Sequence, residues 1–197
     1  MTEIYFVRHG ETAKNKEKLL QGRSNLPMNE KGIRQAEGAR DFLREQGIRF
    51  DVIYSSPLQR AVRTAMIVAG LKDDTKIIRD DRLLEMDYGP YEGLSLEHPS
   101  PEVLDFLMGS HKEPEGMEKL AHVTARMGGF LEEIRRSGSG RGRISTHAIA
   151  MKGALEYLTP GSNGGWWPRE LGNCDVFVTE VQENGFSLPR AVYANRL

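Results

Sequence analysis

Cysteine is nearly absent from this chain of 197 residues, and neither sign of charge dominates it. The single cysteine, Cys174, excludes an internal disulfide, and its place in an expected strand favours a small core residue. A formal net charge of -1 at pH 7 removes any general attraction to nucleic acid or to anionic membranes, so an anion site must be local. We therefore expect neither nucleic acid nor a membrane as a partner.

Membrane spans, a signal peptide and metal-ligand motifs are missing as well. No apolar run approaches the roughly 18 residues that a span requires. Residues 1–3 carry no basic segment followed by an apolar run, which predicts a cytoplasmic location. The five histidines form no close pair with a carboxylate at ligand spacing, so we expect no metal ion and no other cofactor.

What the sequence does contain is an alternation of short apolar runs with segments of helical periodicity. Hydrophobic residues make up 39% and charged residues 28%, which is ordinary for a globular chain of one-domain length. Strands are expected at 4–7, 52–54, 76–78 and 143–146, and helices at 29–43, from 57 to 69, at 101–107, at 117–137 and around 151–158. The second of these helices is expected to have Ser56 as its cap and Pro57 in its first turn. This alternation predicts an α/β three-layer sandwich, in which a mainly parallel central sheet is flanked by helices.

The C-terminal part carries the clearest turn signal. Residues 174–181 and 186–193 flank Asn184-Gly185, a dipeptide typical of tight hairpins, and Pro189 favours a position at the edge. We expect this hairpin to add an antiparallel edge to the sheet. The whole chain, 1–197, is expected to form one domain, with a lid-like insertion at about 97–116.

Two of the expected strands stop at a histidine, His9 and His147. Parallel sheets bind ligands beyond the carboxyl ends of their strands, so folding can bring these two side chains together. Displacement at a phosphate ester needs a nucleophile, positive groups around the transferring oxygens and a proton for the leaving alcohol. An imidazole with an ordinary pKa of about 6.5 can attack without a separate base. Neighbouring arginines would lower the pKa of His9 further and grip phosphate oxygens.

Four short motifs follow one another along the chain. The first is residues 8–12, Arg-His-Gly-Glu-Thr, continued by Asn15, Gln21-Gly22 and 29–36; the second is 55–61, Ser-Ser-Pro-Leu-Gln-Arg-Ala; the third is 84–89 with 92–93; the fourth is 145–147, Ser-Thr-His. Their residues and their order resemble those of the histidine phosphatase superfamily, in its phosphoglycerate-mutase-like branch. The resemblance covers nearly the whole chain.

This resemblance implies a role for each of five side chains. His9 would be the nucleophile that becomes phosphohistidine. Arg8, Arg60 and His147 would bind the phosphoryl oxygens, and Glu85 would act as acid and base. The residue chemistry agrees, because Arg60 is expected in the first turn of its helix, where the dipole favours an anion.

Three further residues are candidates for substrate binding. The resemblance implies that Asn15 assists binding, and Gln21 and Gly22 lie in the same motif. To serve the leaving alkoxide, Glu85 must hold a proton. Burial among its apolar neighbours, or the charge of a bound phosphate, is expected to favour that protonated form.

These features predict a metal-independent phosphomonoester hydrolase that acts on a small phosphorylated metabolite through phosphohistidine. A cofactor-dependent phosphoglycerate mutase is the alternative, but mutases of this branch usually carry extra basic insertions between the second and third motifs, where residues 64–84 are compact here. A catalytically silent binding protein is the second alternative, suggested by Ala148 where the family usually has glycine.

Trp166-Trp167 is expected to pack in the fold rather than to stack on substrate. The identity of the substrate and the oligomeric state stay open.

Overall fold

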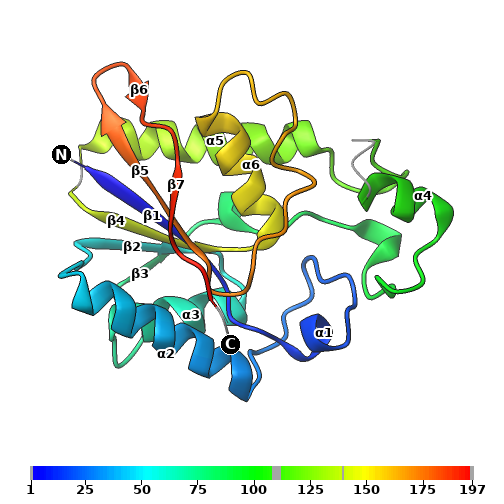
Figure 1. Cartoon of the computed structure of the whole chain (residues 1–197), viewed down its shortest axis with the longest axis horizontal. Helices are drawn as coiled ribbons and strands as arrows, with labels where there is room; N and C mark the ends of the chain where they lie inside the picture. Colours follow the sequence, from blue (N-terminus) through cyan, green and yellow to red (C-terminus); the bar gives the residue numbers. More distant parts are fainter. Residues whose placement is uncertain (1, 108–111, 139, 196–197) are drawn as a thin grey trace.

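A seven-stranded sheet forms the middle layer of the computed structural model, which describes residues 2–107, 112–138 and 140–195 (Figure 1). Its strands are β1 (Glu3–Arg8), β2 (Val52–Ser55), β3 (Ile77–Arg79), β4 (Gly142–Thr146), β5 (Val176–Gln182), β6 (Gly185–Phe186) and β7 (Arg190–Tyr193). The order along the sheet is β3-β2-β4-β1-β5-β6, and β7 also pairs with β5. Strands β1 to β4 are parallel to one another, whereas β5 runs antiparallel to β1 and to β7. The predicted parallel sheet and its antiparallel C-terminal edge are therefore confirmed.

Helices cover both faces of this sheet (Figure 1). They are α1 (Ala13–Lys16), α2 (Glu30–Glu45), α3 (Gln59–Ala69), α4 (Pro101–Asp105), α5 (Leu120–Ser137) and α6 (Ala148–Leu158), with short 3-10 helices η1 (Asp81–Leu83) and η2 (Gly89–Tyr91). Helices α5 and α6 lie on one face, and α2 and α3 lie on the other. Helices α1 and α4 lie on the side toward which the parallel strands point.

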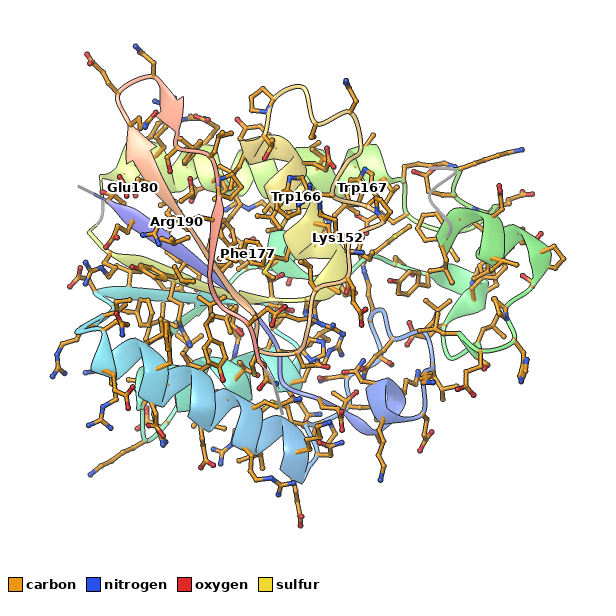
Figure 2. All side chains as sticks on the ribbon, in the orientation of Figure 1. Lys152, Trp166, Trp167, Phe177, Glu180 and Arg190 are labelled. Atoms are coloured by element: carbon orange, nitrogen blue, oxygen red, sulfur yellow. The ribbon has the colours of Figure 1, made fainter. Side chains whose placement is uncertain are left out.

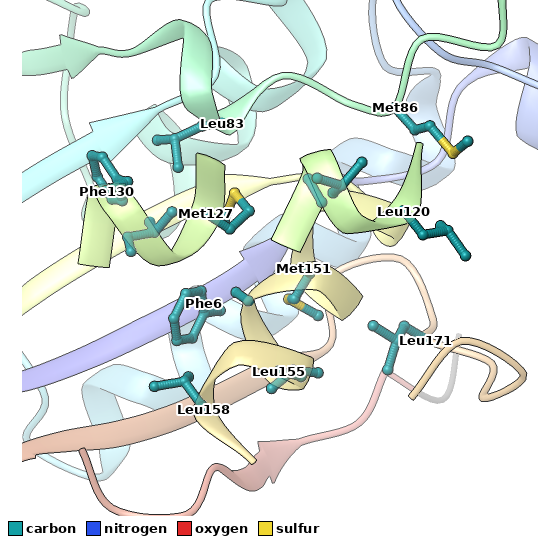
Figure 3. Packing of buried hydrophobic residues seen from close by; sticks show 14 of the residues in the cluster. Phe6, Leu83, Met86, Leu120, Met127, Phe130, Met151, Leu155, Leu158 and Leu171 are labelled. Atoms are coloured by element: carbon teal, nitrogen blue, oxygen red, sulfur yellow. The ribbon is translucent and has the colours of Figure 1, made fainter. Parts of the chain in front are cut away.

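The alternation of side chains along β1 explains how both faces are packed. Ile4 and Phe6 belong to the core under α5 and α6, whereas Tyr5 and Val7 pack toward α2. None of the four is more than 2% exposed. Figure 3 shows Phe6 among side chains of both covering helices, including Met127. Truncating such a residue costs about 3–5 kcal/mol, so β1 is held firmly, and with it the residues at its end.

The register of the strands brings the two predicted histidines to one edge. Arg8 on β1 is paired with Thr146 on β4, and the N–H of His9 donates to the Thr146 carbonyl at 3.0 Å. Strand β2 is the next neighbour of β4 and is followed by Ser56. The carboxyl ends of three adjacent strands therefore meet where His9, Ser56 and His147 begin the following loops.

The prediction that Ser56 caps α3, with Pro57 in its first turn, is wrong. The helix begins at Gln59 and its N-cap is Leu58, which makes no side-chain capping hydrogen bond. The hydroxyl of Ser56 is used instead in a tertiary hydrogen bond with the His147 ring. Sequence alone shows the capping propensity of a serine but not a competing partner that is distant in the chain.

Helix α5 begins at Leu120 rather than at the predicted residue 117. Met117 keeps the apolar spacing because it enters the same core from the preceding loop. The spacing of Met117 from the apolar residues of α5 therefore reflects its packing in the core, although Met117 is not part of the helix. Helix α1 was not predicted, since its four residues are too few to display a period.

The segment predicted as a lid-like insertion, 97–116, contains α4, whose Val103 is fully buried against the core. Residues 108–111 of that segment lie outside the described part of the chain, so its role as a lid stays a prediction. None of the helices in the described residues has the length and apolar character needed to cross a membrane.

Candidate active site

His9 follows β1 directly and is 3% exposed. Its Nδ1 lies 2.8 Å from the carbonyl oxygen of Gly10. Because a carbonyl oxygen can only accept, Nδ1 carries the proton of the neutral ring and Nε2 keeps its lone pair. Burial, followed by the positive charges of Arg60 and Arg8, holds the pKa of His9 well below its ordinary value. The ring is therefore neutral at physiological pH, with an unprotonated Nε2.

His147 stands next to His9, with 5.1 Å between the ring centroids and 60° between the ring planes. Its Nε2 lies 2.8 Å from Ser56 Oγ, which itself accepts from the N–H of Leu58 at 3.4 Å. A serine hydroxyl can donate to Nε2 while it accepts from Leu58, and in that arrangement the proton of the neutral imidazole is on Nδ1. Burial and then the charge of Arg60 hold the pKa of His147 well below its ordinary value, so this ring is neutral as well.

Two guanidinium groups, that of the buried Arg60 and that of the partly buried Arg8, supply the positive charge. Arg60, in the first turn of α3, is fully buried and donates to the carbonyl oxygens of Gly22 and Ser24 at 2.6 and 2.7 Å. Arg8 donates to the carbonyl of Leu171. Burial lowers the pKa of both arginines, that of Arg60 to about 10, and this leaves Arg60 protonated at neutral pH.

Four of the predicted site residues keep a buried nitrogen that has no hydrogen-bond partner among the described residues: Arg8 Nε, Arg60 Nε, His147 Nδ1 and Gln21 Nε2. A buried N–H without an acceptor costs about 1–3 kcal/mol, and native proteins pair nearly all such groups with protein, water or ligand. An anion with several oxygen atoms can accept from several donors at once. In the described part of the chain, no three His, Cys, Asp or Glu side chains are grouped as ligands for a metal ion.

Glu85 enters the site from the loop after η1 and is 3% exposed. Its carboxylate accepts from the N–H of Met86 at 2.9 Å and from Ile149 and Ala150, in the first turn of α6, at 3.2 and 3.0 Å. It thereby caps α6, whose N-cap residue His147 makes no side-chain capping bond. Three backbone N–H groups therefore fix the position of the Glu85 carboxylate beside the first turn of α6.

The loop that carries Glu85 is held by Arg126 on α5. Arg126 donates to the carbonyl oxygens of Arg82 and Leu84 at 2.6 and 2.7 Å and forms an ion pair of 2.8 Å with Glu118. Sequence reasoning missed this residue, because an arginine within a helical period is usually solvated. We describe it as a positioning residue, since its contacts fix the backbone that precedes Glu85.

Asn15 and Gln21 are both tied to Thr12. The Thr12 hydroxyl donates to Gln21 Oε1 at 2.7 Å, and the Thr12 N–H donates to Asn15 Oδ1 at 3.2 Å in the capping box of α1. Asn15 Oδ1 also accepts from Asn173 at 3.3 Å, and Asn173 donates to the carbonyl of His9 at 2.9 Å. The two predicted binding residues are therefore linked to the backbone of His9, and their contact with substrate stays a prediction.

Gly22 has both of its backbone polar groups engaged. Its N–H donates to Glu92 at 2.8 Å, and its carbonyl accepts from Arg60. Glu92 also accepts from Ser24 Oγ at 2.6 Å and from Lys14 at 2.9 Å, while the Ser24 carbonyl is the second acceptor of Arg60. We therefore expect Gly22 to act through Arg60. Glu92 is a second positioning residue, and its motif indicated no role for it.

Helix α6 carries Ala148, the residue that suggested a catalytically silent binding protein, and Lys152. Ala148 is the first residue of the helix and has no positive φ, so a methyl group suits its backbone. Lys152 donates to the carbonyl of Trp167 at 2.8 Å, and burial lowers its pKa to about 8. No sequence pattern marked Lys152, since its relation to Glu85 depends on how α6 packs.

Comparisons with known proteins find relatives over nearly the whole chain. The family model described as Histidine phosphatase superfamily (branch 1) matches residues 4–193. Phosphoserine phosphatase 1 of Hydrogenobacter thermophilus is 30% identical over 190 residues, which cover 93% of this chain and 88% of that protein. A protein of Yersinia pestis named "Probable phosphoglycerate mutase GpmB" is 31% identical over 192 residues, covering 93% of this chain and 87% of the relative.

Among solved structures, a mutant phosphoserine phosphatase from Entamoeba histolytica in complex with phosphoserine has a TM-score of 0.81 with this chain. The match covers 100% of this chain and 98% of that one at 23% identity. At this level of identity the likeness shows a shared fold.

Proposed function

The chain belongs to the histidine phosphatase superfamily, and from this membership we propose that it hydrolyses small phosphomonoesters through a phosphoryl group carried on His9 Nε2. The proposed reaction needs no metal ion, because Arg8 and Arg60 supply the positive charge around the transferring group. Relatives named for phosphoserine, and a structural neighbour solved with phosphoserine, support a small phosphorylated metabolite as the substrate.

One observation carries this proposal, and it is the hydrogen bonding of the His9 ring. Its only hydrogen bond to the described residues runs through Nδ1, which leaves Nε2 unprotonated. A histidine with a purely structural role, buried to this degree, would be expected to use both nitrogens. The unpartnered donors of Arg8, Arg60 and His147 support the same interpretation, since they suit the oxygens of the group that Nε2 would attack.

In the first proposed step, Nε2 of His9 forms a bond to phosphorus while the bond between phosphorus and the alcohol oxygen breaks. Arg8, Arg60 and the Nδ1–H of His147 donate to the phosphoryl oxygens, on which the charge of the transition state is spread. Glu85 gives a proton to the departing alkoxide.

In the second step, the Glu85 carboxylate removes a proton from water as the water oxygen attacks phosphorus. The bond between nitrogen and phosphorus breaks, inorganic phosphate forms, and His9 returns to its neutral state. No other group has to move, because the same carboxylate serves as acid and then as base.

The proposal is tested by hydrolysis of phenyl phosphate with and without an excess of chelator. We expect phosphate release in both conditions and a loss of at least about a thousandfold in His9→Ala, as is typical when a nucleophile is removed. Full loss in chelator that a divalent ion restores would contradict metal independence. Absence of turnover in the unmodified protein would favour the silent binding protein.

The mutase alternative has its own assay, because a relative bears that name. Incubation with 3-phosphoglycerate is expected to release inorganic phosphate with little isomerisation. Conversion to the 2-phosphate isomer without net release of phosphate would show a mutase. The compact connection from α3 through β3 to η1 supports the hydrolase.

A further inference from the structure

A cavity of about 320 Å³ lies between α4, α6 and the loop after α6. Leu96, Phe106, Leu107, Leu120, Ile149 and Trp167 form its apolar wall, and Lys152, Arg169 and Glu170 are its charged lining residues. A volume of this size would hold roughly ten water molecules, at about 30 Å³ each. It is larger than the short alcohol of phosphoserine or phosphoglycerate requires.

This cavity adjoins the proposed proton donor. Ile149 belongs to its wall, and the N–H of Ile149 donates to the Glu85 carboxylate at 3.2 Å. Lys152 lies one helical turn further along α6, and its charge interacts with those of Glu85 and Arg8. Ile149 and Lys152 therefore connect this cavity to the carboxylate toward which the alkoxide would leave.

Both adjacent tryptophans pack against the core under α5 and α6, as predicted, and Trp167 also lines the cavity. The indole N–H of Trp166 donates to Thr159 at 3.1 Å, and its ring packs edge-on against Phe177 at 5.8 Å, so Trp166 serves packing as predicted. Trp167 follows Trp166 on the same loop and lies near Lys152 on α6 (Figure 2). The side chain of Trp167 forms part of the cavity wall. The apolar character of the cavity extends to its rim, where Leu96 and Leu107 are 39% and 37% exposed.

Lys152 is a charge without an ion pair. Its hydrogen bond goes to the Trp167 carbonyl, and no carboxylate of the described residues forms a salt bridge with it. Burial lowers the pKa of Lys152 to about 8, although Glu85 and Glu170 act in the opposite direction. A largely desolvated ammonium group of this kind is stabilised when an anionic group of a ligand comes next to it.

We propose that this cavity binds the alcohol part of the substrate, and that Lys152 and Trp167 select phosphomonoesters whose alcohol combines an aromatic or branched apolar group with a carboxylate. This inference rests on the proposed function, because it specifies the substrate class of the same site. Apolar walls with a few placed polar groups are the usual composition of small-molecule pockets, and a ring beside Trp167 suits this wall.

The role of Lys152 is tested with phenyl phosphate and 4-carboxyphenyl phosphate, assayed for phosphate release. In Lys152→Met we expect kcat/KM for the carboxylated ester to fall about tenfold to a hundredfold more than for phenyl phosphate, as for the loss of one charged hydrogen bond. Comparing the two esters within each protein cancels their different reactivity. The same substitution at Lys72, an exposed residue in the turn after α3, is the control and should leave the ratio as it is.

The role of Trp167 is tested by comparing phenyl phosphate with ethyl phosphate. Trp167→Leu is expected to reduce the preference for the aromatic ester about tenfold, whereas Trp166→Leu is expected to lower the melting temperature and keep that preference. This pair separates a wall of the cavity from a packing residue one position away.

The pH dependence gives a readout that a merely structural lysine would not produce. The preference for the carboxylated ester should decline as the pH rises through about 8, because Lys152 then loses its charge in the free enzyme. Equal losses for both esters in Lys152→Met, or a preference that does not depend on pH, would overturn the inference and leave the proposed hydrolase intact. Failure to release phosphate from any ester would overturn both.

Discussion

At the scale of single residues, two hydrogen bonds determine what the paired imidazoles can do. Gly10 fixes the proton of His9 on Nδ1, and we expect Ser56 to place that of His147 on Nδ1 by donating to its Nε2. In His9 this leaves Nε2 as the atom with a free lone pair, and in His147 it leaves an N–H to donate. Two chemically identical rings thereby acquire different roles from their neighbours.

Replacement of Ser56 by alanine is expected to reduce kcat about tenfold or more, as is typical when a group that orients a functional histidine is removed. The His147 ring would lose the partner that fixes its tautomer, while its position as N-cap of α6 would persist. Steady-state kinetics, together with nitrogen NMR of the histidine rings, measures both effects.

Ser55→Ala is the matched control, because the Ser55 hydroxyl is also buried but donates to the backbone carbonyl of Ser56. We expect that variant to be less stable and to keep a normal ring tautomer. If Ser56→Ala and Ser55→Ala reduced kcat equally, with unchanged ring signals, Ser56 would have no positioning role.

Sequence reasoning identified the charged groups at this scale but not their supports. His9, Arg60 and Glu85 lie within short motifs, so neighbouring residues indicate them. The His9 ring is oriented by the adjacent Gly10, but other partners are distant in the chain: Ser56 and His147 are 91 positions apart, and Ala150 and Glu85 are 65 positions apart. Such pairs are set by strand register and helix packing, which no local pattern contains.

At the scale of elements, the close approach of the β1 end to α2 fixes the loop that carries His9. A Cβ on Gly32, in the first turn of α2, would lie 2.6 Å from the backbone nitrogen of Glu11, and one on Gly10 would lie 2.6 Å from Met28 Sδ. The N–H of Gly32 is used by the N-cap Asn29 at 2.9 Å. Backbone therefore packs on backbone here, and there is no flexible side chain to give way at Gly32.

Gly32→Ala is accordingly expected to destabilise the protein by about 1–3 kcal/mol and to reduce activity, because α2 or the loop after β1 must shift. Gly129→Ala is a control for which we expect stability to rise rather than fall. A Cβ at Gly129, in the exposed middle of α5, meets nothing within 4 Å, so alanine should stabilise by up to about 1 kcal/mol.

Denaturant unfolding measures both glycine variants. Equal stability of Gly32→Ala and the unmodified protein would show that the contact between β1 and α2 is looser than described.

Element types were predictable from the sequence, whereas several boundaries were not. The apolar runs predicted the parallel strands, and Asn184-Gly185 predicted the antiparallel edge, because each of these signals lies within a few consecutive residues. The starts of α3 and α5 differ from prediction because tertiary contacts of Ser56 and Met117 override their local preference. Nothing local indicated that Glu85 would cap α6.

At the scale of the whole molecule, the two buried histidines link stability to pH. The pKa values of His9 and His147 are lower in the folded protein than in the unfolded chain, where they are about 6.5. Below that pH the unfolded chain binds more protons, so the contribution of these rings to stability is fully present above about 6.5 and is lost as the pH falls toward their folded-state values.

We therefore expect the unfolding free energy to fall between about pH 7.5 and pH 5.5, and to fall less in His9→Asn, which lacks one of the two rings. Urea denaturation at both pH values gives the comparison. An identical pH dependence in the variant would contradict the lowered pKa of His9.

The central claim of the account is that His9 Nε2 carries the phosphoryl group. The most direct measurement is a rapid alkaline quench during turnover of phenyl phosphate, followed by intact mass and peptide mapping. We predict one added phosphoryl group on His9 that forms before phosphate is released, and none in His9→Ala. Phosphate release with an unmodified His9 at every time point, or a phosphoryl group on another residue, would contradict the claim.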